Sequence, residues 1–221
     1  MKPKSSGSNV QIYKTLKPLV SVVMPTFNRA TYLQRSINSV LKQSFTDWEL
    51  LIVDDGSSDG TFNVVNEYIS RFENIRYLKH SNRKPALSTN VGVLASCGEY
   101  LAFLGSDDEY KSDHLKLCVE FMEKNPAVDF IHGGVEIVGS PYVKDKNDLT
   151  KKIHLSQCAI GGTFFGKRKI FLELGGFRDL YYSDDSDFFE RVQKEFQIAQ
   201  VDFPTYIYYR DTPDSICTTI E

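Results

Sequence analysis

Short apolar runs and amphipathic segments alternate along the first half of the chain. The apolar runs are of strand length and rich in β-branched and aromatic residues, which is typical of buried strands in a parallel sheet. Between them lie segments whose apolar residues recur at helical spacing, such as Leu33, Ile37 and Leu41. This alternation indicates βαβ units. The pattern predicts strands over Val20–Met24, Trp48–Asp54, Asn74–Leu78 and Tyr100–Leu104, and helices over Thr31–Lys42, Thr61–Arg71, Pro85–Ser96 and Leu115–Lys124.

The regular alternation of predicted strands and helices ends after Pro126. Gly139–Leu155 is polar, lysine-rich and without a clear period, so we expect an irregular, mobile excursion of the kind that often serves as a lid. The order of the predicted strands and helices fits a single α/β domain, with a mostly parallel central sheet flanked by helices. The remaining predicted elements are strands at Val128–Val138 and Thr163–Phe165, a helix at Lys167–Leu174, a helix carrying Asp184–Asp187, and strands near Ile198–Val201 and Tyr206–Arg210.

Composition narrows the function classes. The 221 residues are 41% hydrophobic and 25% charged with a net charge of −3, which offers no electrostatic attraction to nucleic acid. The four cysteines have no CxxC spacing, as in a reduced, cytosolic protein rather than a zinc site or disulfide framework. No apolar run approaches the roughly 20 residues of a transmembrane helix. Residues 1–18 lack an apolar signal core, which favours a flexible leader. We expect a cytoplasmic location, compatible with peripheral contact at the inner face of the membrane.

Two acidic pairs directly follow predicted strands. Asp54-Asp55 ends the second strand and Asp107-Asp108 follows the fourth. Ligands of open α/β sheets bind at the carboxyl ends of the strands, so we expect both pairs at the functional edge. Adjacent carboxylates repel each other and resist desolvation unless a cation or hydrogen-bond donors compensate them. The second pair therefore predicts a site for Mg²⁺ or Mn²⁺, which prefer oxygen ligands.

The first pair and the turn after the first strand each have a simpler alternative. A carboxylate at a strand end can accept a hydrogen bond from a base N–H, and Gly56 permits close approach. A turn and helix cap would explain the same acids, although Asp59 or Thr61 could fill the capping role. At Pro25–Arg29, Phe27 and the following helix N-terminus could hold a planar base and anionic groups, or the segment is a plain strand-to-helix turn.

The acids and glycines of the second half are weaker signals. Asp184-Asp185-Ser186-Asp187 begins a predicted helix, where carboxylates favour the helix dipole with or without a catalytic role. Gly161-Gly162 is a turn, or a point of close approach to substrate if the fold brings one there. The four histidines are scattered, and neither a Ser-His-Asp nor a Cys-His nucleophile arrangement has a local signature.

Taken in order, these segments resemble family 2 of the inverting glycosyltransferases, which has the GT-A fold. The resemblance covers nearly everything from Val20 to Arg210. It implies one catalytic domain over residues 19–221, with a nucleotide-binding half at 19–125 and an acceptor half at 126–221. The matching stretches are Val20–Arg29, Leu51–Thr61, Ser88–Gly92, Gly98–Asp108, Gly175–Phe177 and Asp184–Arg191.

The resemblance also implies roles for individual residues. Asp185 falls at the general base, which removes the proton of an acceptor hydroxyl while that oxygen attacks the anomeric carbon in a single displacement. Asp107 and Asp108 occupy the metal-binding acid motif and would hold Mn²⁺ or Mg²⁺ against the donor diphosphate. The implied donor-binding residues are Pro25, Phe27, Asp54, Asp55, Asn90 and Asp107, and the supporting residues are Asp184, Gly162 and Arg210.

Three positions depart from the family pattern. The metal turn often reads Asp-Ser-Asp-Asp, but Gly105 takes the first place here. Many relatives carry a histidine shortly after Tyr-Arg that helps to hold metal or diphosphate, whereas Asp211 follows Arg210 in this chain and could substitute. The base motif is Asp184-Asp185 in place of the commoner Glu-Asp. The first two departures raise the question of weaker metal binding.

The leading interpretation is a transferase with a nucleotide-sugar donor and a glycan, lipid-linked or other hydroxyl acceptor, in polysaccharide or glycoconjugate biosynthesis. A sugar-phosphate nucleotidyltransferase has related chemistry, but it usually opens with a glycine-rich, basic phosphate loop, and Pro25–Arg29 is neither. The third alternative is a non-catalytic sugar-nucleotide or glycan-binding module. Asp185 is present alongside Asp107-Asp108, which argues against a module that has lost its catalytic activity. The sequence identifies neither the sugar nor the acceptor.

Overall fold

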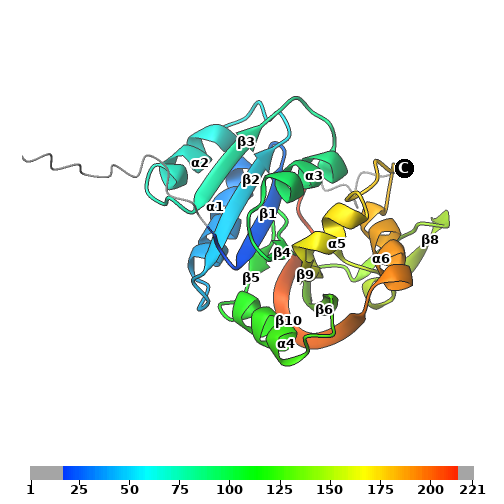
Figure 1. Ribbon diagram of the computed structural model, residues 1–221. Helices are drawn as coiled ribbons and strands as arrows, with labels where there is room; N and C mark the ends of the chain where they lie inside the picture. The colour runs from blue at the N-terminus through cyan, green and yellow to red at the C-terminus, as the bar shows by residue number, and fades with distance from the viewer. Residues whose placement is uncertain (1–16, 214–221) are drawn as a thin grey trace, which may run out of the picture.

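The computed structural model describes residues 17–213 and places the core in one curved sheet (Figure 1). Within these residues, the main sheet has eight strands in the order β3-β2-β1-β4-β9-β6-β10-β5. β1 (Val20–Thr26) lies between β2 (Trp48–Asp54) and β4 (Tyr100–Phe103), and β2 pairs with β3 (Ile75–Lys79). All three pairs are parallel. The carboxyl ends of these strands therefore meet at one edge, as predicted.

The second half of the sheet mixes strand directions. β9 (Phe165–Lys167) runs antiparallel to both β4 and β6 (Phe130–Val138), while β10 (Ile198–Tyr209) runs parallel to β6. The short strand β5 (Glu109–Tyr110) pairs antiparallel with β10 at the edge of the sheet. Because β5 directly follows the second acid pair, this pairing ties the Asp107-Asp108 turn to the C-terminal half of the fold.

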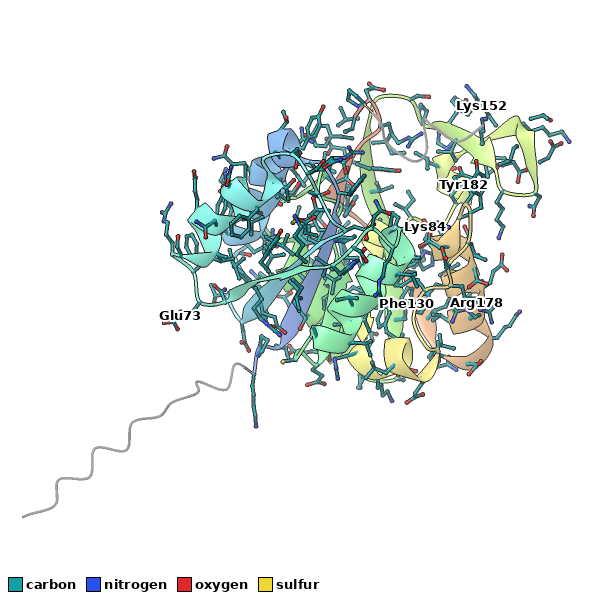
Figure 2. The ribbon with its side chains drawn as sticks, turned by 90° about the horizontal axis from the view of Figure 1, so that it is seen from above. Glu73, Lys84, Phe130, Lys152, Arg178 and Tyr182 are labelled. Atoms are coloured by element: carbon teal, nitrogen blue, oxygen red, sulfur yellow. The ribbon has the colours of Figure 1, made fainter. Side chains whose placement is uncertain are left out.

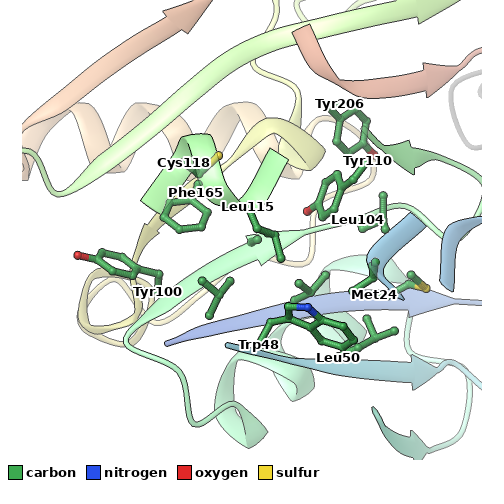
Figure 3. Packing of buried hydrophobic residues seen from close by; sticks show 14 of the residues in the cluster. Met24, Trp48, Leu50, Tyr100, Leu104, Tyr110, Leu115, Cys118, Phe165 and Tyr206 are labelled. Atoms are coloured by element: carbon green, nitrogen blue, oxygen red, sulfur yellow. The ribbon is translucent and has the colours of Figure 1, made fainter. Parts of the chain in front are cut away.

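Helices cover both faces of the sheet, because successive strand residues point to opposite sides. In β1, Val22 and Met24 pack into one core cluster and Val23 into the other. Figure 3 shows part of the first cluster, to which Met24 and Leu50 of the sheet and Leu115 of the helix that begins at His114 belong. The first cluster receives buried residues of α1 (Ala30–Leu41), α2 (Thr61–Ile69) and α4 (His114–Lys124), and the second those of α3 (Pro85–Ala95), α5 (Arg168–Glu173) and α6 (Asp184–Glu195).

Phenylalanine rings dominate the second cluster and fix the beginning of α6. Phe188 stacks on Phe171 and Phe177, with ring centroids 5.0 and 4.5 Å apart. Aromatic pairs at such distances contribute about 0.5–1.5 kcal/mol beyond the burial of their surface. Phe188 lies one helical turn after Asp184. This packing therefore sets the position of the acidic first turn of α6.

The expected irregular excursion over Gly139–Leu155 is wrong, because this segment contains a β-hairpin. β7 (Tyr142–Asp145) pairs antiparallel with β8 (Asp148–His154). Figure 2 shows the hairpin, which carries Lys152, projecting from the body of the molecule. Val143 is buried, but most other side chains of both strands are half-buried or exposed. With water on both faces, the strands need no apolar alternation, and the sequence period that marks a strand is absent.

The two strands expected near Ile198–Val201 and Tyr206–Arg210 are one strand, β10. Its pairing with β6 shifts between Val201 and Tyr206, where Pro204 lacks the N–H that a regular ladder requires. The strand expected at Thr163–Phe165 begins later, at β9, because a 3₁₀ turn over Gly161–Thr163 precedes it.

The other predicted helices and strands agree with the structure to within about two residues at each end. Of the expected leader, residues 1–16 lie outside the described residues, as does Cys217. Cys97 and Cys118 are free thiols. Across residues 17–213 no helix has the length and apolar character needed to cross a membrane.

Candidate active site

A pocket of about 700 Å³ opens at the edge where β1, β2 and β4 end. Its wall combines the turns after these strands with the beginning of α3, the Gly161-Gly162 loop, the first turn of α6 and the end of β10. Asp54, Asn90 and Arg210 do not belong to the lining. The predicted site residues that line it are Pro25, Phe27, Asp55, Asp107, Asp108, Gly162, Asp184 and Asp185.

The second acid pair is held by β10. The Tyr206 hydroxyl donates to Asp108 Oδ2 at 2.5 Å, and the Tyr209 N–H donates to Asp108 Oδ1 at 2.8 Å. Burial and the neighbouring Asp107 charge raise the pKa of Asp108 to about 7, although both hydrogen bonds oppose this rise. Burial also raises the pKa of Asp107, although Arg29 Nε lies 3.7 Å from its Oδ2. Two neighbouring carboxyl groups with raised pKa values form a site that a cation would stabilise.

These carboxylates fit a divalent cation that is shared with a diphosphate. In the part of the chain that the structure describes, no cluster of three acidic, histidine or cysteine side chains could hold a metal by itself. Mg²⁺ is commonly bound through one or two carboxylates, with waters and substrate phosphates as the other ligands. Asp211, the expected substitute for the family's histidine, packs its carboxylate against Gly139 and does not line the pocket. Thr212 instead hydrogen-bonds to Asp107.

The two members of the first acid pair have different surroundings. Asp54 accepts hydrogen bonds from the Ser57 N–H at 2.7 Å and from the Tyr77 hydroxyl. Burial raises the pKa of Asp54, but hydrogen bonds from Tyr77 and Ser57 outweigh this effect and lower it overall. Asp55 lines the pocket, and its Oδ1 accepts from the Arg83 N–H at 2.6 Å. Asp54 therefore stabilises the turn, whereas Asp55 is the member of the pair that belongs to the pocket lining.

The turn after β1 is fastened to the turn after β2. Asn28 adopts a left-handed conformation, with φ of 51°, and its N–H donates to Ser57 Oγ at 2.9 Å. Asp59 accepts from the Thr61 N–H at 2.9 Å at the beginning of α2, so the capping role does not require the acid pair. Phe27 is left 42% exposed in the pocket lining, where a planar ligand can lie against it.

Asp184 and Asp185 reach the pocket from the first turn of α6, which follows Ser183 in a left-handed conformation. Asp185 Oδ2 accepts from the Gly161 N–H at 3.2 Å, and Oδ1 accepts from the Ser186 N–H at 2.7 Å. Burial raises the pKa of Asp185 against the effect of these bonds. Burial and the Asp185 charge raise the pKa of Asp184 to about 6. A carboxylate made more basic by a pocket is suited to general-base catalysis.

The remaining predicted residues connect the elements that carry the site. The Asn90 side chain donates to the Phe177 carbonyl at 2.7 Å and accepts from the Phe177 N–H at 2.8 Å, which joins α3 to the segment before α6. Asp187, the last acid of the α6 cluster, pairs with Arg191 at 2.9 Å. Arg210 is buried just after β10. Of these side chains, Asn90 is the one shown to hold backbone beside the pocket.

Sequence reasoning missed several residues of the pocket. Tyr206 and Tyr209 contact Asp108 from about 100 positions further along the chain. Lys84 also lines the pocket, with φ of 74°, a strained conformation that concentrates at functional sites. Lys84 lies near the middle of the view in Figure 2, at the beginning of α3. A residue before proline favours an extended conformation with negative φ, so the place of Lys84 before Pro85 does not signal this conformation.

Comparison with known proteins gives one family. The model of "Glycosyl transferase family 2" matches residues 21–210. TuaG of Bacillus subtilis (strain 168), whose name assigns it to teichuronic acid biosynthesis, is 42% identical over 141 residues, or 62% of this chain and 53% of TuaG. The Escherichia coli enzyme WfgD, named UDP-Glc:alpha-D-GlcNAc-diphosphoundecaprenol beta-1,3-glucosyltransferase, is 36% identical over 149 residues, or 65% of this chain and 57% of WfgD. The chain spans about half the length of the curated relatives it matches.

Solved structures share the fold. The crystal structure of S. aureus TarS 1-349 in complex with UDP-GlcNAc has a TM-score of 0.75 at 22% identity, covering 91% of this chain and 61% of that one. The mannosyltransferase PcManGT from Pyrobaculum calidifontis, in complex with GDP-Man and Mn²⁺, has a TM-score of 0.70 at 21% identity, covering 90% and 59%. The expected GT-A fold is confirmed.

Proposed function

The chain belongs to glycosyltransferase family 2, and from that membership we propose that it transfers a sugar from a nucleotide-diphosphate sugar to an acceptor hydroxyl, with inversion at the anomeric carbon. Residues 19–221 act as one catalytic domain, in which residues 19–125 bind the donor and residues 126–221 bind the acceptor. We place the product in polysaccharide or glycoconjugate biosynthesis, and the name of TuaG, which assigns that relative to teichuronic acid biosynthesis, supports this.

The observation that carries the proposal is the convergence of three acidic groups on one pocket. Asp55, the pair Asp107-Asp108 and the pair Asp184-Asp185 are far apart in sequence, yet all line it. A single displacement needs a group that recognises the nucleoside, charge compensation at the leaving diphosphate, and a base at the acceptor oxygen. The three groups supply one requirement each.

Asp185 acts as the general base. Its carboxylate, held by the N–H groups of Gly161 and Ser186, accepts the proton of the acceptor hydroxyl. The acceptor oxygen then bonds to the anomeric carbon as the bond from that carbon to the diphosphate oxygen breaks, and the electron pair leaves with the nucleoside diphosphate. The raised pKa of Asp185 strengthens it as a base. Asp184 supports this site, as do Gly162 and Arg210.

Asp107 and Asp108 would hold Mn²⁺ or Mg²⁺ beside the donor diphosphate. When bound, the cation offsets the negative charge that develops on the leaving group. Arg29 adds a permanent positive charge at this place, since its guanidinium lies 3.7 Å from Asp107. The Mn²⁺ in the structure named for PcManGT supports a divalent cation here.

Nucleoside recognition falls to Asp55 and Phe27. The Asp55 carboxylate can accept a base N–H, and the exposed Phe27 ring can cover the base. Pro25 shapes this part of the lining, while Asp54 and Asn90 position it from outside. We take UDP-glucose as the first donor and a lipid-linked GlcNAc diphosphate as the first acceptor, because the name of WfgD contains both. With a lipid-linked acceptor, we propose that the chain works in peripheral contact with the inner face of a membrane.

Product analysis separates transfer from the two alternatives. The chain is incubated with Mn²⁺ and a panel of nucleotide sugars, with either a lipid-linked GlcNAc diphosphate or soluble saccharides as acceptor. A glycosylated acceptor with released nucleoside diphosphate is the expected result. In a parallel incubation with added pyrophosphate, formation of sugar phosphate and nucleoside triphosphate from the nucleotide sugar would identify a nucleotidyltransferase. Donor binding without any product would identify a binding module. The variant Asp185→Asn controls for contaminating activity, because it should bind donor without transferring the sugar.

A further inference from the structure

The Tyr206 side chain is enclosed where the two halves of the pocket meet. Its hydroxyl donates to Asp108 Oδ2 at 2.5 Å and accepts from the Gly105 N–H at 3.2 Å. Its ring packs so closely on Gly162 that a Cβ at that position would overlap the ring. The ring also meets Tyr110 edge-on, with centroids 5.8 Å apart. Figure 3 shows the two tyrosines beside each other above the sheet. Because the ring is confined on several sides, the position of its hydroxyl is fixed.

The orientation of Asp108 depends on this hydroxyl and on the glycine at position 105. A Cβ at Gly105 would lie 2.5 Å from Asp108 Oδ2, closer than nonbonded atoms approach, so a larger residue would displace the carboxylate. The Tyr209 N–H holds the other oxygen at 2.8 Å. Gly105 stands where the family often has an additional acid. In this chain the missing side chain makes room for the carboxylate that Tyr206 holds.

We infer that Tyr206 is a positioning residue, which holds the Asp108 carboxylate in the orientation that binds the divalent cation. The inference rests on the proposed function and extends it to β10, outside the acidic motifs. A carboxylate with both oxygens hydrogen-bonded to fixed donors loses little freedom when it coordinates an ion. Outer-sphere partners of this kind typically change metal affinity by about 10- to 100-fold.

The test compares Tyr206→Phe with Tyr110→Phe. Each change removes one hydroxyl from a buried ring, and the two rings touch each other. The Tyr110 hydroxyl donates to the Phe103 carbonyl at 2.6 Å rather than to an acid, which makes it a matched control. Mn²⁺ is titrated calorimetrically into each protein with UDP bound, and thermal unfolding is measured on the same samples. Tyr206→Phe should weaken Mn²⁺ binding by about 10- to 100-fold, while Tyr110→Phe lowers thermal stability and leaves Mn²⁺ affinity unchanged.

Gly105→Ala provides a second, independent variant. Alone it should weaken Mn²⁺ binding, because the added methyl group displaces Asp108. In the Tyr206→Phe background it should have a smaller effect, because both changes disturb the same carboxylate orientation and their energies will not add. Additive effects would overturn the inference, as would equal Mn²⁺ affinities of the wild type and Tyr206→Phe. A wild type that binds no Mn²⁺ would overturn the proposed metal role as well. If the wild type binds Mn²⁺ and transfers sugar, and Tyr206→Phe behaves in the same way, the inference about Tyr206 is overturned and the proposed function stands.

Discussion

Asp184 and Asp185 are neighbours on α6, yet their surroundings give them different properties. Asp185 accepts two backbone hydrogen bonds that orient its oxygens, one from the Gly161 loop and one from α6 itself. Asp184 has a pKa raised to about 6 by burial and by the adjacent Asp185 charge. Two neighbouring, half-buried carboxyl groups disfavour simultaneous ionisation. The better-oriented group is therefore assigned as the base.

Asp185→Asn should lower kcat by about 10²- to 10⁴-fold, because the amide keeps the shape of the side chain but cannot take the acceptor proton. UDP affinity, measured by calorimetry, should stay near that of the wild type. Asp184→Asn, the matched control, should be milder in the same kinetic assay. If Asp184→Asn proves inactive while Asp185→Asn keeps most of its activity, the base is Asp184.

Asp55→Ala should raise KM for the donor while kcat at saturating donor changes little. Recognition of the nucleoside is equal in the ground state and the transition state, so its loss appears in KM. Initial rates over a range of donor concentrations measure both constants. A large fall in kcat with unchanged KM would remove Asp55 from the donor-binding role.

The acidic site residues can be predicted from the sequence, because the strand ends of a parallel sheet share one edge and this places Asp55 near Asp107. The tyrosines cannot be predicted in this way. Tyr206 lies in a strand whose apolar and aromatic pattern looks like ordinary core, and its acid partner is 98 residues earlier. Thr212 reaches Asp107 in the same way. Only the tertiary fold brings these pairs together.

At the scale of elements, burial explains which strands the sequence predicts correctly. β1, β2 and β4 are covered on both faces, so their apolar runs are continuous and easily recognised. The β7–β8 hairpin lacks such a run because water reaches both of its faces. The sequence pattern divides β10 in two at Pro204, because proline normally ends a strand. In the structure the strand continues past Pro204, and its pairing with β6 shifts register there.

The packing of α4 against β10 should make stability sensitive to acid. His114, the first residue of α4, stacks on Tyr110 and shares a 2.8 Å hydrogen bond with Thr205 Oγ1. Burial lowers the pKa of His114 to about 3, so the unfolded chain binds its proton at a higher pH than the folded one. This contribution to the free energy of unfolding is complete above about pH 6.5 and falls as pH drops towards 3, by up to about 1.4 kcal/mol per pH unit.

His114→Asn should remove that pH dependence. Urea unfolding of both proteins at several pH values between 7.5 and 5 measures it. The variant should be less stable at pH 7.5, because it loses the stacked ring, and the gap to the wild type should narrow as the pH falls. A gap that stays constant or widens would show that His114 is not the proton-linked group.

At the scale of the whole molecule, the sheet joins two halves with different strand directions. The parallel half ends in the turns that carry Asp55 and Asp107-Asp108, and the mixed half brings the Gly161 loop and the first turn of α6 to the same edge. β5 links the two halves, because this strand directly follows the acid pair and is hydrogen-bonded to β10, which carries Tyr206. This arrangement puts the proposed metal-binding pair and the proposed base on different halves of one pocket, which is compatible with the single displacement proposed above.

The anomeric configuration of the product tests this account most directly. UDP-glucose carries an α-linked sugar, and attack by an acceptor oxygen deprotonated by Asp185 would reach the carbon from the side opposite the diphosphate. We therefore expect a β-linked product, visible in the anomeric proton coupling of its NMR spectrum, with one UDP released for each sugar transferred. An α-linked product from the same donor would contradict the single displacement and the role assigned to Asp185.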